Sequence, residues 1–421
     1  MPTVGPAADF LARLEEPNHV LFVQIPKPLR GFIMASIESG ILLIADISGY
    51  TRFLASSELE HAQDSLRSLL NLIIEHTRPP LVISRLEGDA VISYAPAGSF
   101  QQGQTIVEII ESTYYDFCRA RELMMLNTTC TCNACRNIPN LDLKFFVHFG
   151  AFMLEPLHTY TELIGTDVNL IHRLTKNSVT QQTDLKAYVA YTQAAVAALG
   201  IERIAETMTR HAETYESIGE VQLYLDDLRS KWEEEKTRTR MSVQEEQAAL
   251  MIEDDFPLPP LMMWDIVSSP QYKAILSGSK SARVDNLTNG RIGLGATFYC
   301  AHGSHVSSQT IVDWQPPKEY TWTSDPVFGI YMLNTVRLRL SDGGSHLAIL
   351  CGKPMGGRRL TRWLFMVIVG PIGLWGMKQN LRNLHRQIEI DLSEERLCEP
   401  TTRAVEGDEV LSAAREALTI E

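Results

Sequence analysis

The sequence predicts an α+β protein with two domains, and three observations carry that prediction. Residues 40–226 give apolar runs and helical patterns in the order strand, helix, hairpin, helix, strand, helix, strand, which favours one sheet with helices on one face. Residues 257–395 give a short helix, several strands joined by glycine turns and one long terminal helix. The chain has 421 residues, which is too long for one ordinary core.

The elements of the first domain follow from the spacing of apolar residues. Residues 41–45 are continuously apolar, as in a buried strand, and residues 66–74 carry apolar side chains at helical spacing. Two prolines at 79–80 end that helix, and 81–94 reads as two strands joined at 87–89. A helix over 106–126, a strand over 143–152, a helix over 168–174 and a strand over 221–225 complete the domain.

Composition shifts divide the chain into five segments. We expect an N-terminal extension (1–35), a first domain (36–226), a charged helical linker (227–256), a second domain (257–395) and a polar tail (396–421). The linker pattern is also that of an ordinary solvated helix. In the second domain, strands are expected around 292–300, 307–314, 319–323 and 331–340.

Overall composition narrows the class of protein. The formal charge is −13, from 38 basic and 51 acidic residues, so nonspecific nucleic-acid binding is not expected. Seven cysteines and no secretory signal predict a cytoplasmic protein with reduced thiols. The longest apolar run, 363–377, has 15 residues interrupted by glycine and proline, so no transmembrane helix is expected.

Two carboxylates stand where a metal–phosphate site would place them. Asp46 ends the buried strand and Asp89 sits at the tip of the hairpin. Carboxylates on neighbouring strands can hold Mg²⁺ against phosphate oxygens, although such residues also serve as turn or cap residues. Between Asp46 and the next helix lies a turn whose backbone N–H groups could cradle a polyphosphate: Ile47, Ser48, Gly49, Tyr50 and Thr51.

Three motifs together resemble those of class III nucleotidyl cyclases. They are DISGYTRF at 46–53, RLEGDAV at 85–91 and IGTDVNLIHRL at 164–174, and their order and separations match across residues 40–226. The resemblance implies a ferredoxin-like catalytic domain that converts ATP to cyclic AMP and pyrophosphate with two Mg²⁺ or Mn²⁺ ions per site. It also implies a head-to-tail homodimer, since metal and transition-state residues of one site come from different subunits. The implied roles are metal binding for Asp46 and Asp89, purine recognition for Arg85 and Glu162, and transition-state binding for Asn169 and Arg173.

The purine-binding positions favour ATP over GTP. Arg85 only donates and an ionised Glu162 only accepts, which suits the N1 acceptor and N6 donor of adenine. Arg85 replaces the family's lysine and Glu162 its aspartate or threonine, so both side chains are longer than usual. An inactive cyclase fold that binds nucleotide without turnover, or a carrier of hydrophobic ligands, is the alternative.

A cysteine cluster interrupts the first domain. Cys130, Cys132 and Cys135 form C-x-C-x₂-C, a spacing that fits a thiolate site for structural Zn²⁺ with Cys118, His148 or a group from a partner subunit as fourth ligand. An iron–sulfur site and a cluster of plain reduced thiols remain open. The cluster resembles a cysteine knuckle in a subgroup of cyclase-like domains of unassigned function.

The second domain resembles the START/polyketide-cyclase-like (SRPBCC, helix-grip) superfamily. The resemblance rests on LMMWDIVSSPQY at 261–272, IVDWQPPKEYTW at 311–322 and a long final helix over about 359–390. It implies an apolar cavity for a small molecule or lipid, and thus a regulatory role. A filled core is the alternative for the five candidate lining residues, which are Trp314, Trp322, Phe328, Tyr331 and Met366. Basic residues around 363–377 fit either an anionic membrane contact or the capping of a buried helix.

Overall fold

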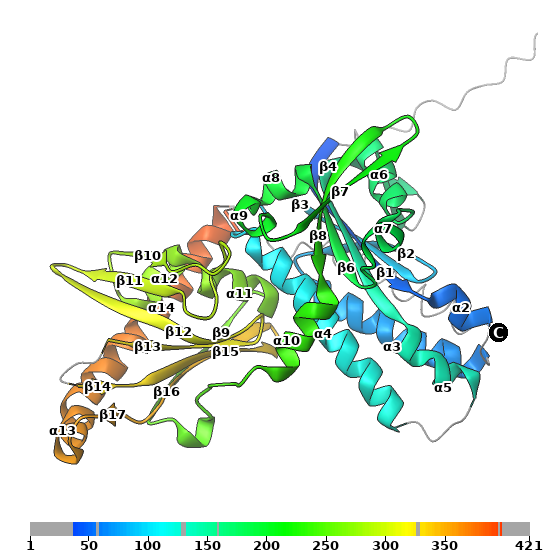
Figure 1. The fold of residues 1–421 in the computed structure, drawn as a ribbon. Coiled ribbons are helices and arrows are strands. Elements are labelled where there is room, and N and C mark those ends of the chain that lie inside the picture. The colour runs from blue at the N-terminus through cyan, green and yellow to red at the C-terminus, as the bar shows by residue number, and fades with distance from the viewer. Residues whose placement is uncertain are drawn as a thin grey trace, which may run out of the picture. The chain divides into compact units, whose positions relative to one another are not determined.

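The computed structural model describes residues 37–55, 59–127, 132–157, 160–325, 329–394 and 396–397 (Figure 1). The expected extension (1–35), most of the polar tail, Cys130 and Phe328 lie outside these residues.

The first sheet has eight strands and is centred on β1 (Ile37–Ser48). This strand pairs antiparallel with β3 (Ala90–Pro96) on one side and β4 (Asp142–Leu157) on the other. The order is β2-β3-β1-β4-β6-β8-β7, with β5 paired to β4. The remaining strands are β2 (Val82–Glu87), β5 (Tyr160–Ile164), β6 (Tyr188–Thr192), β7 (Thr209–Tyr215) and β8 (Gly219–Asp227).

Both faces of this sheet are covered, so the expectation of helices on one face is wrong. Alternate residues of β1 enter two separate cores because side chains along a strand alternate between faces. Leu43 packs in the core that includes α3 and α4, and Leu42 packs in the core that includes α6. The helices are α2 (Tyr50–Ala55), α3 (Leu59–Thr77), α4 (Gln104–Asn127), α5 (Asn133–Asn137), α6 (Thr166–Leu174), α7 (Val179–Thr183), α8 (Gln193–Leu199), α9 (Glu202–Ala205) and α10 (Leu228–Thr237).

The second sheet has seven antiparallel strands in the order β10-β11-β12-β13-β15-β16-β9. Its buried face packs against α11 (Pro260–Ser268) and the inner side of α14 (Gly370–Ser393). The mixed α+β class is therefore confirmed. The strands are β9 (Leu250–Phe256), β10 (Ser281–Asp285), β11 (Thr297–His302), β12 (His305–Gln315), β13 (Glu319–Ser324), β15 (Leu333–Ser341) and β16 (Gly344–Cys351), and β14 (Ile330–Tyr331) pairs with β17 (Met355–Gly356).

The predicted helical linker over 227–256 is wrong in its second half. Helix α10 ends at Thr237, and β9 forms an edge strand of the second sheet by pairing with β16. Only Ile252 and Phe256 of β9 are buried, while acidic residues occupy much of its length. Because of this acidic composition, the strand was predicted to be part of the charged helical linker.

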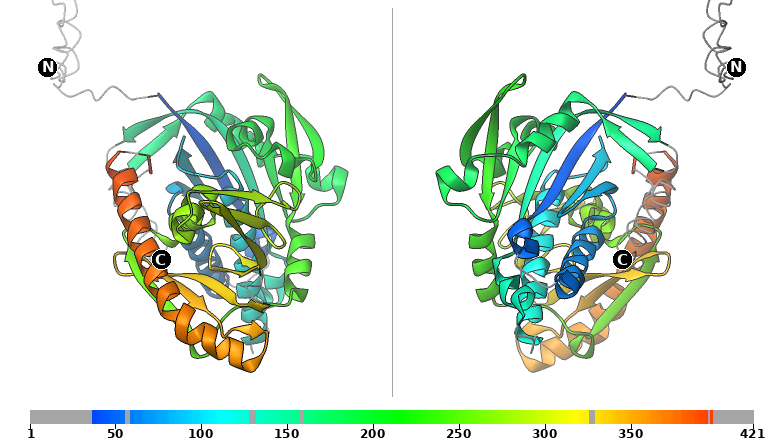
Figure 2. Two further views of the ribbon diagram at one scale, coloured as in Figure 1. Left: turned by 90° about the vertical axis from the view of Figure 1, so that its left-hand side faces the viewer. Right: turned by 90° about the vertical axis from the view of Figure 1, so that its right-hand side faces the viewer.

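The predicted terminal helix is broken. Helix α13 (Arg359–Leu364) leads through one π-helical turn (Phe365–Val369) into α14, and the whole segment forms one long bent rod coloured orange to red in Figure 2. Pro371 accounts for the break because it lacks the N–H that the preceding turn would accept. In the described part of the chain, no single helix meets the length and hydropathy of a membrane span; the pair Arg359–Ile368 and Gly370–Ser393, bent by 46°, meets them together on length and composition alone.

Two of the residues predicted to line an apolar cavity, Trp314 and Tyr331, line two different pockets. Trp314 is buried against Trp264, with ring centroids 4.9 Å apart. The Lys273 ammonium, on α12 (Pro270–Ser277), lies 3.9 Å from the centroid of the Trp322 ring. Tyr331 lines a separate hollow of about 380 Å³, and Phe328 is outside the described residues.

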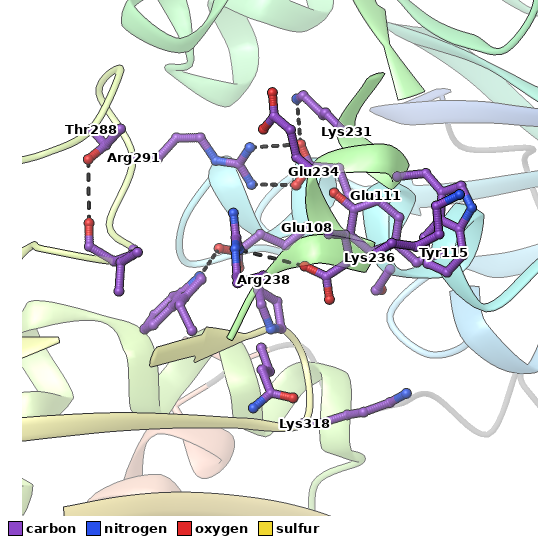
Figure 3. A pocket seen from close by; sticks show the side chains of 18 of the residues that line it. Glu108, Glu111, Tyr115, Lys231, Glu234, Lys236, Arg238, Thr288, Arg291 and Lys318 are labelled. Carbon is purple, nitrogen blue, oxygen red and sulfur yellow. Dashed lines mark hydrogen bonds and ion pairs between the residues drawn. The ribbon is translucent and has the colours of Figure 1, made fainter. Parts of the chain in front are cut away.

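The two sheets are joined through α4, and residues from Ile37 onward form one compact unit. Arg291 makes two hydrogen bonds of 2.7 Å to the carboxylate of Glu111, which also accepts from Lys231 at 2.6 Å. Just before α4, Asp265 of α11 accepts from the backbone N–H groups of Gln101 and Gln102, and it also accepts from the Thr105 hydroxyl in the first turn of the helix. Figure 3 shows Arg291 facing Glu111 beside a pocket of about 880 Å³.

We predict that Arg291→Gln lowers the free energy of unfolding by about 3 kcal/mol, because Glu111 would keep its buried charge with one partner fewer. Urea denaturation followed by tryptophan fluorescence measures the change. Arg283→Gln is the matched control, since its side chain is 73% exposed and its ion pair with Asp285 is worth less than about 1 kcal/mol. Equal effects of the two substitutions would contradict the prediction.

Candidate active site

Strand pairing brings the two predicted metal-binding carboxylates together. Asp46, near the end of β1, lies in register with Ala90 on β3 and Lys144 on β4. Asp89 occupies the tight turn between β2 and β3, and its carbonyl accepts a 3.1 Å hydrogen bond from the N–H of Ile47. The hairpin therefore carries Asp89 back to the end of β1, where Asp46 stands.

A pocket of about 730 Å³ opens at this point, and it contains the whole predicted turn. Gly49 has a φ of +89°, and a Cβ there would lie 2.8 Å from the carbonyl oxygen of Asn140, so the turn requires glycine. Four basic residues that sequence reasoning missed also line the pocket, namely Arg52, Lys144, Lys186 and Arg229. The pocket thus combines the two carboxylates predicted to bind metal with cations suited to phosphate.

Burial and mutual repulsion disfavour the ionised forms of Asp46 and Asp89. Burial raises the pKa of Asp46 to about 6, and the nearby charge of Asp89 adds to the effect while Lys144 opposes it. Burial also raises the pKa of Asp89. A divalent cation would relieve this repulsion, and oxygen donors suit Mg²⁺ or Mn²⁺. The described residues contain no group of three or more His, Cys, Asp or Glu able to hold a metal, so the remaining ligands would be phosphate oxygens and water.

The two predicted purine-binding residues touch each other. The Arg85 guanidinium, on β2, forms an ion pair with Glu162 on β5. It also pairs with Glu87 at 2.6 Å and lies 3.3 Å from Nε2 of His172. Burial lowers the pKa of His172, with Glu87 opposing the shift, so the ring is neutral near pH 7 and accepts from Arg85. Glu87 and His172 were missed because the sequence alone does not place β2 beside α6.

The two predicted transition-state residues lie apart from the carboxylate pocket. Asn169 and Arg173 are four residues apart on α6, so they share one helix face, and both are exposed. Neither residue lines the pocket that contains Asp46 and Asp89. One chain therefore carries two separate halves of the predicted constellation.

The cysteine cluster is only partly described. The N–H of Cys135 lies 3.4 Å from Sγ of Cys132, which caps α5, and Cys130 falls outside the described residues. Cys118 is buried in the same core as Ala134 of α5. His148 lies on the opposite face of the sheet, 2.8 Å from the Thr192 hydroxyl, so it is unsuited as a zinc ligand there. The zinc site remains a prediction.

Comparisons with known proteins give two sequence matches. Residues 66–184 match a family described as "Protein of unknown function (DUF2652)". An uncharacterized protein from Mycobacterium tuberculosis is 28% identical over 163 residues, which cover 39% of this chain and 73% of that protein.

Solved structures similar to this chain include nucleotidyl cyclase domains. The adenylyl cyclase CyaB from P. aeruginosa has a TM-score of 0.34 at 16% identity, covering 45% of this chain and 94% of that one. The guanylyl cyclase Cya2 has a TM-score of 0.35 at 13% identity, covering 45% and 92%. Protein MLL2253 from Mesorhizobium loti has a TM-score of 0.26 at 17% identity, covering 33% and 96%.

We predict that Mn²⁺ raises the melting temperature of the protein at about pH 8 but much less at about pH 5. The pKa of Asp46 in the folded protein is raised to about 6. Without metal, ionisation of the pair therefore lowers the stability of the fold as the pH rises through about 6. Below that pH, protons displace the metal from the carboxylates. Asp46→Asn should abolish the Mn²⁺ shift in a thermal melt.

Asp64→Asn is the control for that experiment, because Asp64 is an exposed carboxylate on α3. It should retain the full Mn²⁺ shift. An unchanged shift in Asp46→Asn, or none in the wild type, would rule out a metal site at the carboxylate pair.

Proposed function

We propose that this protein is a nucleotidyl cyclase that converts ATP to cyclic AMP and pyrophosphate at a homodimer interface. The observation that carries the proposal is the pocket in which Asp46 and Asp89 meet the turn 47–51 and four basic residues. A triphosphate needs all three features, namely sites for divalent ions, backbone donors and compensating positive charge.

Different residues of the pocket would contribute differently to the binding of a triphosphate. Lys144 and Arg229 reach it from β4 and α10, and Arg229 is held by Asp142 at 2.5 Å. Asp46 and Asp89 would hold Mg²⁺ or Mn²⁺, which would acidify the ribose 3′-hydroxyl and neutralise phosphate charge. Positioning the 3′-oxygen close to the α-phosphate is then the main task of the protein.

Base selection would fall to Arg85 and Glu162. Their direct ion pair places a donor and an acceptor side by side, which matches the N1 and N6 edge of adenine. Adenine would bind by exchanging this ion pair for two hydrogen bonds to the base. Guanine presents a donor at N1 and an acceptor at O6, so it would need the opposite arrangement.

A second copy of the chain would complete the site. Asn169 and Arg173 are exposed on α6 and do not line the carboxylate pocket of their own chain. In a head-to-tail dimer, these residues would meet the pocket of the partner, where Asn169 would orient the ribose. Arg173 would stabilise charge on the phosphoryl oxygens, for which its rigid guanidinium is suited.

We further propose that the second half, as a START-like domain binding an apolar molecule or lipid, regulates the site through α10. Arg229 on this helix lines the carboxylate pocket, while Lys231 binds Glu111, the partner of Arg291. A shift of the second sheet would therefore act on the pocket through α4 and α10.

A nucleotide sensor without turnover is the second candidate. The position of Asn169 and Arg173 favours it, because neither lines the pocket of its own chain, so a single chain could bind a triphosphate there without the predicted transition-state residues.

We predict that pure protein incubated with Mn²⁺ forms cyclic AMP from ATP and much less cyclic GMP from GTP. Asp46→Ala should reduce product at least about a hundredfold, because metal-bound phosphate is lost. Chromatography with mass detection identifies the product. Cyclic GMP as the main product would contradict the assignment of Arg85 and Glu162; nucleotide binding without product would establish the sensor.

We predict that two inactive variants restore each other. Asp46→Ala lacks a metal ligand and Asn169→Ala lacks the ribose contact, so a mixed dimer would contain one site with neither defect. Activity of the mixture should approach one quarter of the wild-type value after subunit exchange, from about half the dimers carrying one good site each. Asp46→Ala mixed with Asp89→Ala is the control and should stay inactive, since both lesions fall in the same half-site.

A further inference from the structure

The bent rod formed by α13, the π-helical turn and the start of α14 exposes large apolar side chains. Two tryptophans are prominent, Trp363 at 59% and Trp375 at 72% exposure. Leu360, Val367, Ile368 and Ile372 are 53–68% exposed on the same segment. Soluble surfaces rarely gather so many apolar groups in one place, and contiguous patches of this kind mark a binding surface.

The inward side of the same rod is anchored. Leu381, Leu384 and Ile388 of α14 are buried in the core of the second sheet. Their three- and four-residue spacing defines one helix face, and the exposed side chains begin where that face runs out. The rod is therefore held at one end and presents its apolar surface at the other.

Positive charge surrounds this surface. Residues 343–388 contain seven Lys or Arg and no Asp or Glu, in a chain whose formal charge is −13. Arg358, Arg359 and Arg362 lie at one end of the apolar stretch, and Lys378 and Arg382 at the other. None of these five makes an ion pair with another residue in the part of the chain that the structure describes.

The geometry fits a segment that lies on a bilayer. Its first arm, Arg359–Ile368, is too short to cross roughly 30 Å of hydrocarbon, and the 46° bend prevents a straight continuation. Amphipathic helices with tryptophan on the apolar side and Lys or Arg around it bind at the level of the lipid headgroups.

We propose that the rod docks the protein on the surface of an anionic lipid bilayer. Trp363, Ile372 and Trp375 enter the headgroup region, and the arginines and lysines bind lipid phosphates. A second copy of this chain is a poorer occupant, because two such surfaces would bring unpaired positive charges together. An anionic surface satisfies both the apolar groups and the charges.

Vesicle co-sedimentation of the full-length protein tests the proposal. We expect at least about tenfold tighter binding to vesicles containing about one-third phosphatidylglycerol than to pure phosphatidylcholine, weakened by high salt. The double variant Trp363→Glu/Trp375→Glu should lose this binding. Its matched control is Leu126→Glu/Leu340→Glu, which alters two side chains exposed to 81% and 79% elsewhere on the protein and should bind like the wild type.

Quenching by brominated lipids separates insertion from loose adsorption. Trp363 and Trp375 should be quenched in wild type, and Trp363→Phe/Trp375→Phe should remove the quenching while keeping vesicle binding. Absence of binding to anionic vesicles, or equal loss in the Leu126/Leu340 control, would overturn the proposal. A dimer in lipid-free solution that Trp363→Glu/Trp375→Glu converts to monomer would also overturn it, in favour of self-association.

Discussion

One buried carboxylate organises the contact between the two sheets. Glu108 on α4 is 1% exposed and accepts 2.8 Å hydrogen bonds from the indole N–H groups of Trp264 and Trp314 and from the amide of Gln104. Burial raises the pKa of Glu108 to about 7, while the charge of Arg291 and these bonds oppose the shift. The polar centre of the aromatic core in the second half is thus a side chain of the first half, and α4 cannot move without disturbing that core.

The candidate site depends on this arrangement through a short chain of contacts. Helix α10 packs on α4, where Trp232 and Tyr115 have ring centroids 5.9 Å apart. The same helix carries Arg229 into the carboxylate pocket. Packing against α4 therefore fixes the position of Arg229, which we propose binds phosphate, so the pocket and the aromatic core are mechanically coupled. Two domains joined only by a flexible linker would not be coupled in this way.

Local sequence patterns correctly predicted the elements whose formation depends on neighbouring residues in the chain. The buried strand before Asp46, the hairpin at Asp89 and the helix carrying Asn169 all formed where apolar spacing and turn residues indicated. Features that need a partner far away in the chain were missed. Lys144 enters the pocket only because β4 pairs with β1, and β9 is a strand only because β16 offers an edge. The fold class was readable from sequence, while the composition of the pocket required strand pairing.

The hydrogen bonds between Asp265 and the start of α4 have a consequence for how such a protein can change over generations. The two halves cannot be exchanged separately, because a transplanted first half would lose the Asp265 hydrogen bonds at the start of α4 and the tryptophan partners of Glu108. A transplanted second half would also need residues 250–256, which precede its first helix in the chain. Recombination that keeps the fold must transfer both halves together or replace the contacts between them. The two halves are therefore inherited as one unit.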